Sequence, residues 1–299
     1  MTISSPHRCG YVAVIGRPNV GKSTLVNRLV GQQVSITARR PQTTRHRILG
    51  ICTRDEFQAI YIDTPGLHRE GKHAMSRYLN RTANSTLAMG ADVVLFVIAG
   101  TKWTEEDDLV LERLAEVKVP VILVVNKVDL VKDKKTLMPH LQQLSLRRDF
   151  AHVVPLSALR GDNIASLERV IVPLLSERDA EFPEDQVTDR SLRFLAAELV
   201  REKLTRYLGA ELPYSLTCEV ERFVETAGLT KIGVVIWVER PGQKAIVIGK
   251  DGAMLKRVGQ EARADMELNL DCKVFLETWV RVREGWSNDE LMLRSLGYE

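Results

Sequence analysis

The 299-residue sequence has no run of apolar residues close to the length of about 20 that crosses a lipid bilayer. Its first residues, MTISSPHRCGYVAVIG, lack the basic stretch and the apolar core of a secretion signal. The four cysteines, Cys9, Cys52, Cys218 and Cys272, lie far apart and show no paired spacing. These absences argue against a membrane-spanning chain, a disulfide framework and a zinc site, and we expect a reducing, cytoplasmic environment.

A large excess of charge of one sign is also missing, because the formal net charge is only +3. The two halves nevertheless differ. Residues 1–180 hold 25 Lys and Arg against 18 Asp and Glu, and residues 181–299 hold 17 against 21. Overall charge therefore does not indicate a nucleic-acid-binding protein, and that function would depend on local groups of basic residues.

Short runs of Val and Ile alternate with helical patterns in the first half of the chain. Runs such as YVAVIG, ADVVLFVIAG and VPVILVVNKVD have almost no polar alternation, which is typical of strands buried on both faces. The alternation predicts an α/β domain with a mainly parallel sheet and helices on both faces.

The second half has a different order of elements. A long helix closed by Gly209 precedes two strands, a short segment ending at Gly249, a further helix and a last strand, which predicts a smaller α+β domain. The charged, proline-bearing stretch SERDAEFPEDQVTD separates the two halves. We therefore expect domains at 8–176 and 190–299, the second with a C-terminal tail, joined by a linker at 177–189.

The first apolar run leads directly into GRPNVGKST, which matches the phosphate-binding pattern GxxxxGK[ST]. Backbone N–H groups of such a loop, with the N-terminus of the following helix, bind phosphate oxygens. Lys22 is expected to reach the β- and γ-phosphates, and the Ser23 hydroxyl to bind Mg²⁺. The residues of this loop predicted to bind nucleotide are Gly16, Arg17, Pro18, Asn19, Val20, Gly21, Lys22, Ser23 and Thr24.

Two further motifs follow in the order expected of a nucleotide-dependent switch. In YIDTPG, Asp63 is expected at the end of a strand, where it can hold Mg²⁺ through water, and the Gly66 N–H can meet the γ-phosphate. In PQTTRHR, Thr44 is the candidate threonine that binds Mg²⁺ only when a γ-phosphate is present, and Thr43 is the alternative. Nucleotide binding is predicted here for Asp63, Thr64, Pro65 and Gly66, and metal binding for Ser23, Thr44 and Asp63.

Specificity for the base is indicated by the motif NKVD, which also follows a strand. The Asp129 carboxylate can accept N–H bonds from N1 and the 2-amino group of guanine, and adenine offers no such pair. In VPLSAL, the Ser157–Ala158 backbone is placed to contact guanine O6. The sequence therefore predicts GTP rather than ATP, with contacts from Asn126, Lys127, Asp129, Ser157, Ala158 and Leu159.

Groups that accelerate hydrolysis are scarce in this sequence. Leu67 stands where Ras-like proteins have the glutamine that orients the attacking water, and leucine cannot hydrogen-bond water. His68 is an alternative for that role, against the interpretation that it is simply solvated. We expect slow turnover with Lys22, Thr44 and Gly66 as the catalytic residues, helped by Mg²⁺ and backbone donors.

Asn19, inside the phosphate loop, leaves one cofactor open. Its carboxamide oxygen can bind a monovalent cation such as K⁺ beside the phosphates, where the cation would supply the charge of a missing arginine finger. The alternative is a loop asparagine that merely tolerates its turn, and the sequence does not decide between the two.

Two features of the second half concern its surface. The turn IVIGKDGAMLKRVG has two glycines three apart, and glycine lets another backbone approach closely because it has no Cβ. It is either a ligand-binding turn or an ordinary corner between helices. The helix at Arg190–Leu208 carries Arg193, Arg201, Lys203 and Arg206 among Glu198 and Glu202, a pattern usual for a solvated face rather than a membrane patch.

Taken together, GRPNVGKST, QTTRHR, DTPGLH, NKVD and SAL, followed by an α+β segment with VIGKDG, resemble the bacterial Era GTPase family. The resemblance extends from about Tyr11 to Gly297. It implies a P-loop G domain joined to a type II KH domain, whose GxxG loop clamps single-stranded RNA. It also implies binding of 16S rRNA, a role in assembly and maturation of the 30S small ribosomal subunit, and peripheral contact with the inner face of the cell inner membrane.

On this resemblance, RNA binding is predicted for Lys244, Gly249, Lys250, Asp251, Gly252, Lys256 and Arg257. Asp251 departs from a fully basic loop. A monomer is the default expectation. The alternative function is a regulatory GTPase whose C-terminal domain docks a protein or membrane partner. The negative net charge of the second half favours that alternative, and the GxxG turn with adjacent lysines favours RNA.

Overall fold

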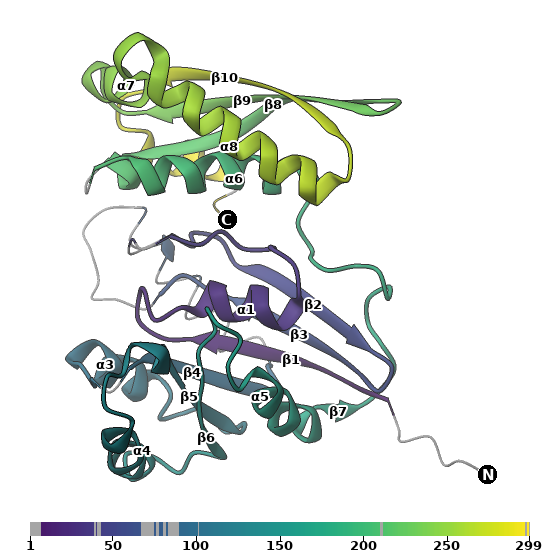
Figure 1. Ribbon diagram of the computed structural model, residues 1–299, viewed down its shortest axis with the longest axis vertical. Coiled ribbons are helices and arrows are strands. Elements are labelled where there is room, and N and C mark those ends of the chain that lie inside the picture. The colour runs from purple at the N-terminus through teal and green to yellow at the C-terminus, as the bar shows by residue number, and fades with distance from the viewer. Residues whose placement is uncertain are drawn as a thin grey trace. The chain divides into compact units, whose positions relative to one another are not determined.

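The computed structural model describes residues 7–38, 40, 43–66, 75, 78, 79, 82, 90–100, 102–209, 212–296 and 298. Packing divides the chain into two compact units (Figure 1). The N-terminal unit consists of Met1–Ser35, Thr44–Glu70 and Leu79–Asp189, and the C-terminal unit of Ile36–Thr43, Gly71–Tyr78 and Arg190–Glu299. The units show which residues pack together. That residues 8–176 and 190–299 fold as separate domains, joined by a linker at 177–189, stays a prediction.

A sheet forms the centre of the N-terminal unit. Its strands in the described residues are β1 (Arg8–Ile15), β2 (Ile48–Arg54), β3 (Phe57–Asp63), β4 (Val93–Ala99), β5 (Val121–Asn126), β6 (His152–Pro155) and β7 (Ser176–Glu177). The order across the sheet is β2-β3-β1-β4-β5-β6, with β7 beside β1. Because β2–β3 and β1–β7 are antiparallel and the other pairs are parallel, the sheet is mainly parallel, as predicted.

Helices cover both faces of this sheet. They are α1 (Lys22–Val30), α3 (Glu105–Arg113), α4 (Leu137–Ser145) and α5 (Ile164–Ile171), with 3₁₀ turns at Val128–Leu130, Lys134–Thr136 and Val172–Leu174. Leu25 of α1 and Leu167 of α5 share a core with Val12, whereas Val110 of α3 shares another with Ala13. Neighbouring strand residues point to opposite faces, so the fold predicted from the uniformly apolar strands is confirmed.

The parallel strands bring three predicted motifs to one edge of the sheet. Gly16 directly follows β1, Asp63 ends β3 and Asn126 ends β5. Because these strands run in the same direction, their carboxyl ends share one edge. Ligands of α/β sheets bind at that edge.

The stretch expected to be a linker, 177–189, packs along the N-terminal unit. Ile51 N donates to Val187 O at 2.9 Å, and Leu49 N donates to Asp189 Oδ1 at 3.0 Å. The Gln58 side chain donates to Phe182 O at 2.8 Å. This polar stretch therefore has defined partners on β2 and β3.

The C-terminal unit has a three-stranded sheet. Its elements are α6 (Leu192–Tyr207), β8 (Leu216–Thr226), β9 (Leu229–Val238), α7 (Pro241–Ile248), α8 (Ala253–Leu270), β10 (Lys273–Val282) and α9 (Glu290–Ser295), with 3₁₀ turns at Leu212–Ser215, Lys250–Gly252 and Trp286–Asn288. The strand order is β10-β9-β8, with β9–β10 parallel and β8–β9 antiparallel. Figure 1 shows α6 and α8 on the same side of this sheet, and their Leu204 and Val258 share its core with Val234. The predicted α+β order is confirmed.

The prediction that the charged residues of α6 form a solvated face holds for Arg193 and Arg206, which are exposed, and is wrong for the other four. Glu198, Arg201, Glu202 and Lys203 are each at most 6% exposed. Arg201 pairs with Glu198, and Lys203 pairs with Glu202 and with Asp265 of α8. Charges that are paired and hydrogen-bonded are tolerated in a packed environment, and a pattern of alternating sign does not reveal this pairing.

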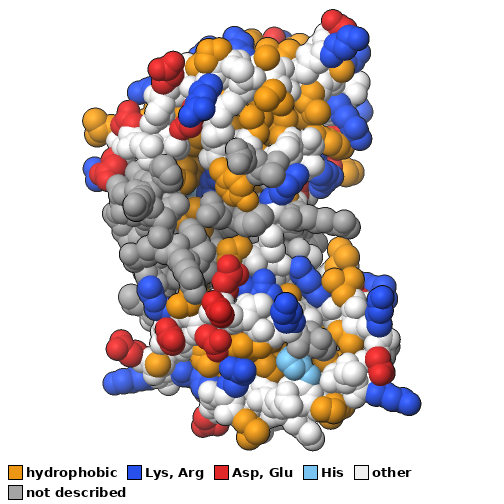
Figure 2. Space-filling model, turned by 90° about the vertical axis from the view of Figure 1, so that its left-hand side faces the viewer, with side chains coloured by type: hydrophobic (Ala, Val, Ile, Leu, Met, Phe, Trp, Pro, Cys, Tyr) orange, Lys and Arg blue, Asp and Glu red, His pale blue; other side chains and the backbone are white. Residues whose placement is uncertain are grey.

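Positive and negative side chains are interspersed on the face of the molecule that Figure 2 shows, where neither sign forms one continuous patch. This agrees with the small net charge of +3. None of the helices in the described part of the chain combines enough length with enough apolar character to span a lipid bilayer.

Candidate nucleotide-binding site and RNA-binding surface

The phosphate loop between β1 and α1 turns through left-handed backbone at Asn19, with φ 62°, and Gly21, with φ 98°. A Cβ at Gly21 would lie 2.4 Å from Asn126 Nδ2, so only glycine fits between the loop and the NKVD motif. Asn19 is exposed, and asparagine enters left-handed backbone more readily than most residues. Its conformation suits the structural interpretation, and the K⁺ alternative stays open.

Lys22 is buried beneath this loop, with 6% of its surface exposed. Its Nζ donates to Gly16 O and to Arg17 O, each at 3.1 Å. Burial lowers the pKa of Lys22 to about 8, an effect that the nearby Asp63 carboxylate partly offsets. An anion near this buried ammonium would stabilise its charge, and the phosphates of a nucleotide would provide one.

Two of the predicted residues, Ser23 and Thr44, meet beside the Asp63 carboxylate, which is fully buried. Ser23 Oγ lies 2.7 Å from Thr44 Oγ1, and Thr44 Oγ1 lies 3.5 Å from Asp63 Oδ2. Thr43 does not join this cluster, because its hydroxyl donates to Arg40 O at 2.7 Å. The structure therefore brings Thr44, rather than the alternative Thr43, to the predicted metal site.

This cluster has the chemistry of a Mg²⁺ site. Asp63 Oδ1 is buried and has no hydrogen-bond partner within the part of the chain that the structure describes. Burial raises the pKa of Asp63, and a hydrogen bond from Ser35 opposes the shift, so a nearby divalent cation would stabilise the charged carboxylate. Adjacent ligands of an octahedral Mg²⁺ lie about 2.9 Å apart. The 2.7 Å between Ser23 Oγ and Thr44 Oγ1 fits that spacing.

Ser35 and Asn27 belong to this site and were missed by sequence reasoning. Ser35 Oγ donates to Asp63 Oδ2 at 2.6 Å. Asn27 of α1 accepts from Ser35 N at 2.9 Å and donates to Ser35 O at 2.6 Å, which fixes the serine in place. Asn27 is half-buried and lies off the buried face of α1, so the helical pattern gave no signal for it.

The second phosphate motif lies against the phosphate loop. A Cβ at Gly66 would be only 2.6 Å from Pro18 N, so the two backbones are in close contact. Thr64 is buried, and its hydroxyl donates to Val14 O at 3.0 Å. Pro65 is also buried. Leu67 and His68, the candidates for the water-orienting position, lie outside the described residues.

The base motifs brace one another. Asn126 Nδ2 donates to Val20 O at 2.8 Å, and its Oδ1 accepts from Ala158 N at 3.0 Å. Lys127 Nζ donates to Asn19 O at 2.5 Å. Asn126 and Lys127 therefore tie the phosphate loop to the base motifs through their side chains.

Asp129 is held in place by Ser157, whose Oγ donates to Asp129 Oδ1 at 2.6 Å. The carboxylate thus keeps an orientation suited to a pair of N–H donors. Leu159 is 71% exposed, and its carbonyl accepts from Arg28 at 2.8 Å. Arg28 of α1 supports this loop and was not predicted.

Arg17 is the predicted loop residue whose side chain is engaged elsewhere. Its Nε donates to Asp107 Oδ1 of α3 at 3.1 Å, and the Asp107 side chain is fully buried. The Arg17 guanidinium therefore anchors the loop to α3, and its contribution to phosphate binding falls to the backbone N–H.

In the C-terminal unit, the GxxG turn links α7 to α8 through left-handed backbone at Gly249, Asp251 and Gly252. A Cβ at Gly249 would lie 2.6 Å from Met254 Cβ, whereas nothing lies within 4 Å of the same position at Gly252. Glycine is therefore required at position 249 by packing against Met254, whereas the space beside Gly252 is open. Lys244 and Lys250 are exposed nearby.

A shallow groove of about 370 Å³ begins at this open glycine. It is lined by Gly252, Leu255, Lys256, Gly259, Gln260, Arg263, Leu276 and Thr278 of α8 and β10. Arg257 is not among these residues, because its guanidinium lies 4.1 Å from the Tyr207 ring centre and pairs with Glu261. Gln260, Arg263 and Thr278 were not predicted, since only the fold brings the strand beside the helix.

Known proteins share both halves of this arrangement. A family model described as a 50S ribosome-binding GTPase matches residues 11–127, and a KH domain model matches residues 211–287. A GTPase Era from Pseudomonas fluorescens is 55% identical over 298 residues, which cover 100% of this chain and 99% of the relative. A GTPase Era from Xanthomonas oryzae is 59% identical over 296 residues, which cover 99% of each chain.

Solved structures match over the same length. A crystal structure of Era in complex with MgGDPNP and nucleotides 1506–1542 of 16S ribosomal RNA has a TM-score of 0.94 and 37% identity, with coverage of 98% of this chain and 99% of that chain. An Aquifex aeolicus Era variant bound to GDP·AlF₄⁻ also has a TM-score of 0.94 and 37% identity, with coverage of 97% and 99%. The resemblance deduced from the motifs is confirmed, and the chain belongs to the Era family of GTPases.

Proposed function

We propose that the protein binds GTP with Mg²⁺, hydrolyses it slowly and uses this cycle to control its binding of 16S rRNA during assembly of the 30S subunit. The observation that carries the proposal is the buried cluster of Ser23, Thr44 and Asp63, whose free Oδ1 and closely spaced hydroxyls suit Mg²⁺ beside a phosphate loop. The Era structures bound to MgGDPNP with rRNA, and to GDP·AlF₄⁻, support the same combination of ligands.

In the phosphate site, the Ser23 and Thr44 hydroxyls would hold Mg²⁺ directly and Asp63 would hold it through water. The metal neutralises charge on the β- and γ-phosphates. Lys22 adds a second positive charge, and the Gly66 N–H is placed to donate to the γ-phosphate. Because Leu67 cannot orient water, turnover depends on these groups and is slow.

In the base site, the Ser157 hydroxyl holds Asp129 so that its carboxylate can accept the two N–H donors of guanine. Adenine offers no such pair, so ATP would leave the carboxylate without the two donors that guanine supplies, and binding would be weaker. This difference supports GTP and GDP as the ligands.

In the C-terminal unit, the open Gly252 and the groove beyond it suit a sugar–phosphate backbone followed by unstacked bases. Lys256 and Arg263 supply positive charge along the groove. The alternative, a domain that docks a protein partner, is not favoured, because the KH domain model and the rRNA-bound Era structure match this unit.

The test is binding of labelled single-stranded RNA from the 3′ end of 16S rRNA, in the presence of a GTP analogue or GDP. Gly252→Asp should weaken RNA binding about tenfold or more, because it places a carboxylate where a phosphate would approach. Gly228→Asp is the matched control, since Gly228 has φ 77° and also has nothing within 4 Å of its Cβ position.

Both variants should bind GTP as the wild type does. The RNA part of the proposal is contradicted if the wild type does not bind this RNA, or if Gly252→Asp and Gly228→Asp bind it equally well. Either result would make the GxxG turn an ordinary corner between helices.

We also propose that the protein works as a monomer in the cytoplasm, where ribosomal subunits are assembled, with peripheral contact at the inner face of the cell inner membrane. The membrane contact rests on the family resemblance alone. Fractionation of cells at low and high salt tests it, because peripheral binding through basic side chains weakens as salt rises. Recovery of the protein entirely in the cytosol at low salt would contradict the membrane contact.

A further inference from the structure

The residues from Ile36 to Thr43, here called the switch segment, lie in sequence between two partners of Asp63. Ser35 Oγ donates to Asp63 Oδ2 at 2.6 Å, and Thr44 Oγ1 lies 3.5 Å from the same oxygen. The switch segment itself packs within the C-terminal unit. Its sequence neighbours Ser35 and Thr44 thus contact Asp63, whereas Thr37 and Thr43 of the segment bond to side chains of α6.

Side chains of α6 hold the body of the switch segment. Thr37 donates twice to Glu202 Oε1, from its N–H at 2.9 Å and from its hydroxyl at 3.2 Å. Arg201 donates to Thr43 O at 2.5 Å, next to the metal-site threonine. Arg201 and Glu202 therefore bond to two residues of the switch segment, one of which directly precedes Thr44.

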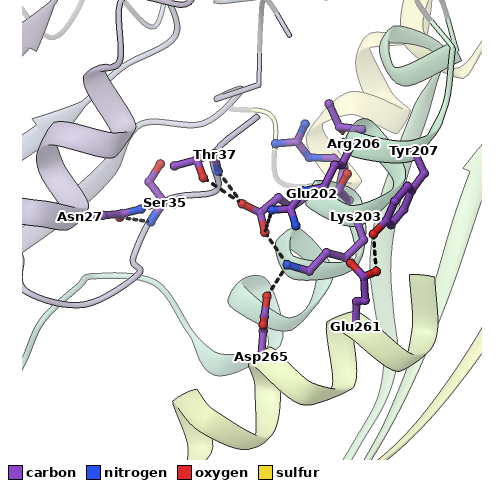
Figure 3. A network of polar contacts seen from close by, with 11 residues as sticks. Asn27, Ser35, Thr37, Glu202, Lys203, Arg206, Tyr207, Glu261 and Asp265 are labelled. Carbon is purple, nitrogen blue, oxygen red and sulfur yellow. Dashed lines mark hydrogen bonds and ion pairs between the residues drawn. The ribbon is translucent and has the colours of Figure 1, made fainter. Parts of the chain in front are cut away.

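Glu202 is a buried carboxylate that uses its two oxygens differently, as Figure 3 shows. One oxygen accepts from Thr37, and the other accepts from Lys203 Nζ at 2.9 Å. The side chains of Glu202 and Lys203 are 2% and 4% exposed. Burial makes each partner costly to remove, so the arrangement is tightly defined.

The same lysine continues to α8. Lys203 Nζ also bonds to Asp265, and one turn earlier on α8 Glu261 accepts from Tyr207 of α6 (Figure 3). The first residue of α8 directly follows Gly252. Polar contacts therefore run from the switch segment to the helix that begins at the GxxG turn.

We propose that Glu202 is a positioning residue that holds the switch segment in the arrangement suited to Mg²⁺ and GTP, and that Lys203 and Asp265 connect this arrangement to the RNA-binding helix. The proposal rests on the proposed function. The 2.7 Å between Ser23 Oγ and Thr44 Oγ1 is close to the spacing of neighbouring Mg²⁺ ligands, so the docked segment already places both hydroxyls for one metal.

The two sites are then coupled for a physical reason. GDP offers no γ-phosphate and gains little from the position of Thr44, whereas a GTP analogue with Mg²⁺ gains from it. RNA that holds α8 in place also holds Asp265, which bonds to Lys203. Lys203 in turn bonds to Glu202 and keeps its side chain in place. By reciprocity, RNA should tighten binding of the GTP analogue by the same factor as the analogue tightens binding of RNA.

The experiment uses the full chain and measures dissociation constants for a non-hydrolysable GTP analogue and for GDP, with Mg²⁺. Each is measured with and without single-stranded RNA from the 3′ end of 16S rRNA. Glu202→Ala should weaken analogue binding about tenfold, leave GDP binding within about twofold, and bring the effect of RNA close to none.

Asp265→Asn should separate the two parts of the proposal. It leaves Thr37 bonded to Glu202, so the preference for the analogue over GDP should be kept while the effect of RNA is reduced. Thr37→Val removes the bond from the Thr37 hydroxyl to Glu202 and leaves the ion pair between Glu202 and Lys203 in place. It should lower the preference for the analogue over GDP about threefold.

The matched control is Glu221→Gln, which neutralises a carboxylate of the same unit whose ion pair is with Arg281 of the sheet. Thermal unfolding confirms that each variant is folded. Nucleotide preference in both Glu202→Ala and Thr37→Val equal to that of Glu221→Gln would overturn the role of Glu202. An undiminished RNA effect in Asp265→Asn would overturn the connection to α8. A wild type that binds no RNA contradicts the proposed function instead, and the nucleotide preference still tests Glu202.

Discussion

The phosphate loop and the GxxG turn both carry the chain through left-handed backbone into the first residue of a helix. In the phosphate loop, a Cβ at Gly21 would lie 2.4 Å from Asn126 Nδ2, so the glycine is required by the protein itself. At Gly252, nothing lies within 4 Å of that position. The glycine of the first turn is therefore required by contacts within its own unit, and that of the second is not.

A buried cation of each unit, Lys22 and Arg201, shows a similar contrast in how its charge is balanced within the protein. Burial removes the Lys22 ammonium from water and lowers its pKa to about 8, because the Asp63 charge offsets only part of that cost. Burial also opposes the charge of Arg201, but the paired Glu198 outweighs it and raises the pKa of the guanidinium. Arg201 is satisfied within the protein, whereas Lys22 gains most when an anion arrives.

The largest expected effect comes from Gly21→Ala. It combines left-handed backbone with a clash against Asn126, so we expect GTP affinity to fall by about a hundredfold or more, since the loop that binds phosphate must shift. Gly31→Ala is the matched control, because Gly31 closes α1 with φ 85° and has nothing within 4 Å of its Cβ position. It should cost about 1 kcal/mol of stability from backbone strain and leave GTP affinity intact.

Gly252→Ala should behave like Gly31→Ala in thermal unfolding. Calorimetry of unfolding and titration with a fluorescent GTP analogue distinguish the cases. Equal GTP affinity for Gly21→Ala and Gly31→Ala would contradict the idea that the phosphate loop needs glycine for its own packing.

Residues whose roles depend on local spacing could be predicted from the sequence. The motifs around Lys22, Asp63 and Asp129 lie at one edge of the sheet because parallel strands bring their carboxyl ends together. Apolar strands without polar alternation likewise predicted a sheet covered on both faces, and helices on both faces are found.

Residues whose roles depend on distant partners could not be predicted. Glu202 was assigned to a solvated helix face, because the residues next to it in the sequence do not indicate that Thr37, 165 positions away, donates to it. Gln260 and Arg263 line the groove only because β10 packs beside α8. In each case the decisive contact arises from tertiary packing, which patterns of neighbouring residues in the sequence do not predict.

The next effect in size is a dependence of GTP affinity on pH. Above about pH 8 the Lys22 ammonium of the empty protein loses its proton, whereas the phosphates of GTP are already ionised and favour the charged lysine. Binding must then take up a proton, so affinity should fall by up to about tenfold per pH unit as pH rises. The free energy of unfolding of the empty protein should rise between about pH 8 and 10.5. In this range the unfolded chain keeps the Lys22 proton that the folded protein has lost.

Titration calorimetry in buffers of different ionisation enthalpy measures the proton uptake directly. Lys22→Arg keeps its charge over this range and serves as the control, with weaker but flatter binding. GTP affinity that stays constant from pH 7 to about 9.5 in the wild type, without proton uptake, would contradict the assigned role of the Lys22 pKa.

The smallest expected effect concerns Asn19, the exposed residue of the phosphate loop. If its carboxamide oxygen binds K⁺ beside the phosphates, turnover in K⁺ should exceed turnover in Na⁺ by a few-fold, well below the 10³–10⁵ that an arginine finger supplies. The affinity for GDP should be the same in both salts, because the cation acts on charge that develops only during hydrolysis. Asn19→Gly keeps the left-handed backbone at φ 62° and removes the oxygen, so it separates the two roles. Loss of the K⁺ effect in this variant would assign Asn19 as the ligand. Equal rates in K⁺ and Na⁺ for the wild type would leave Asn19 as a residue that shapes the turn and nothing more.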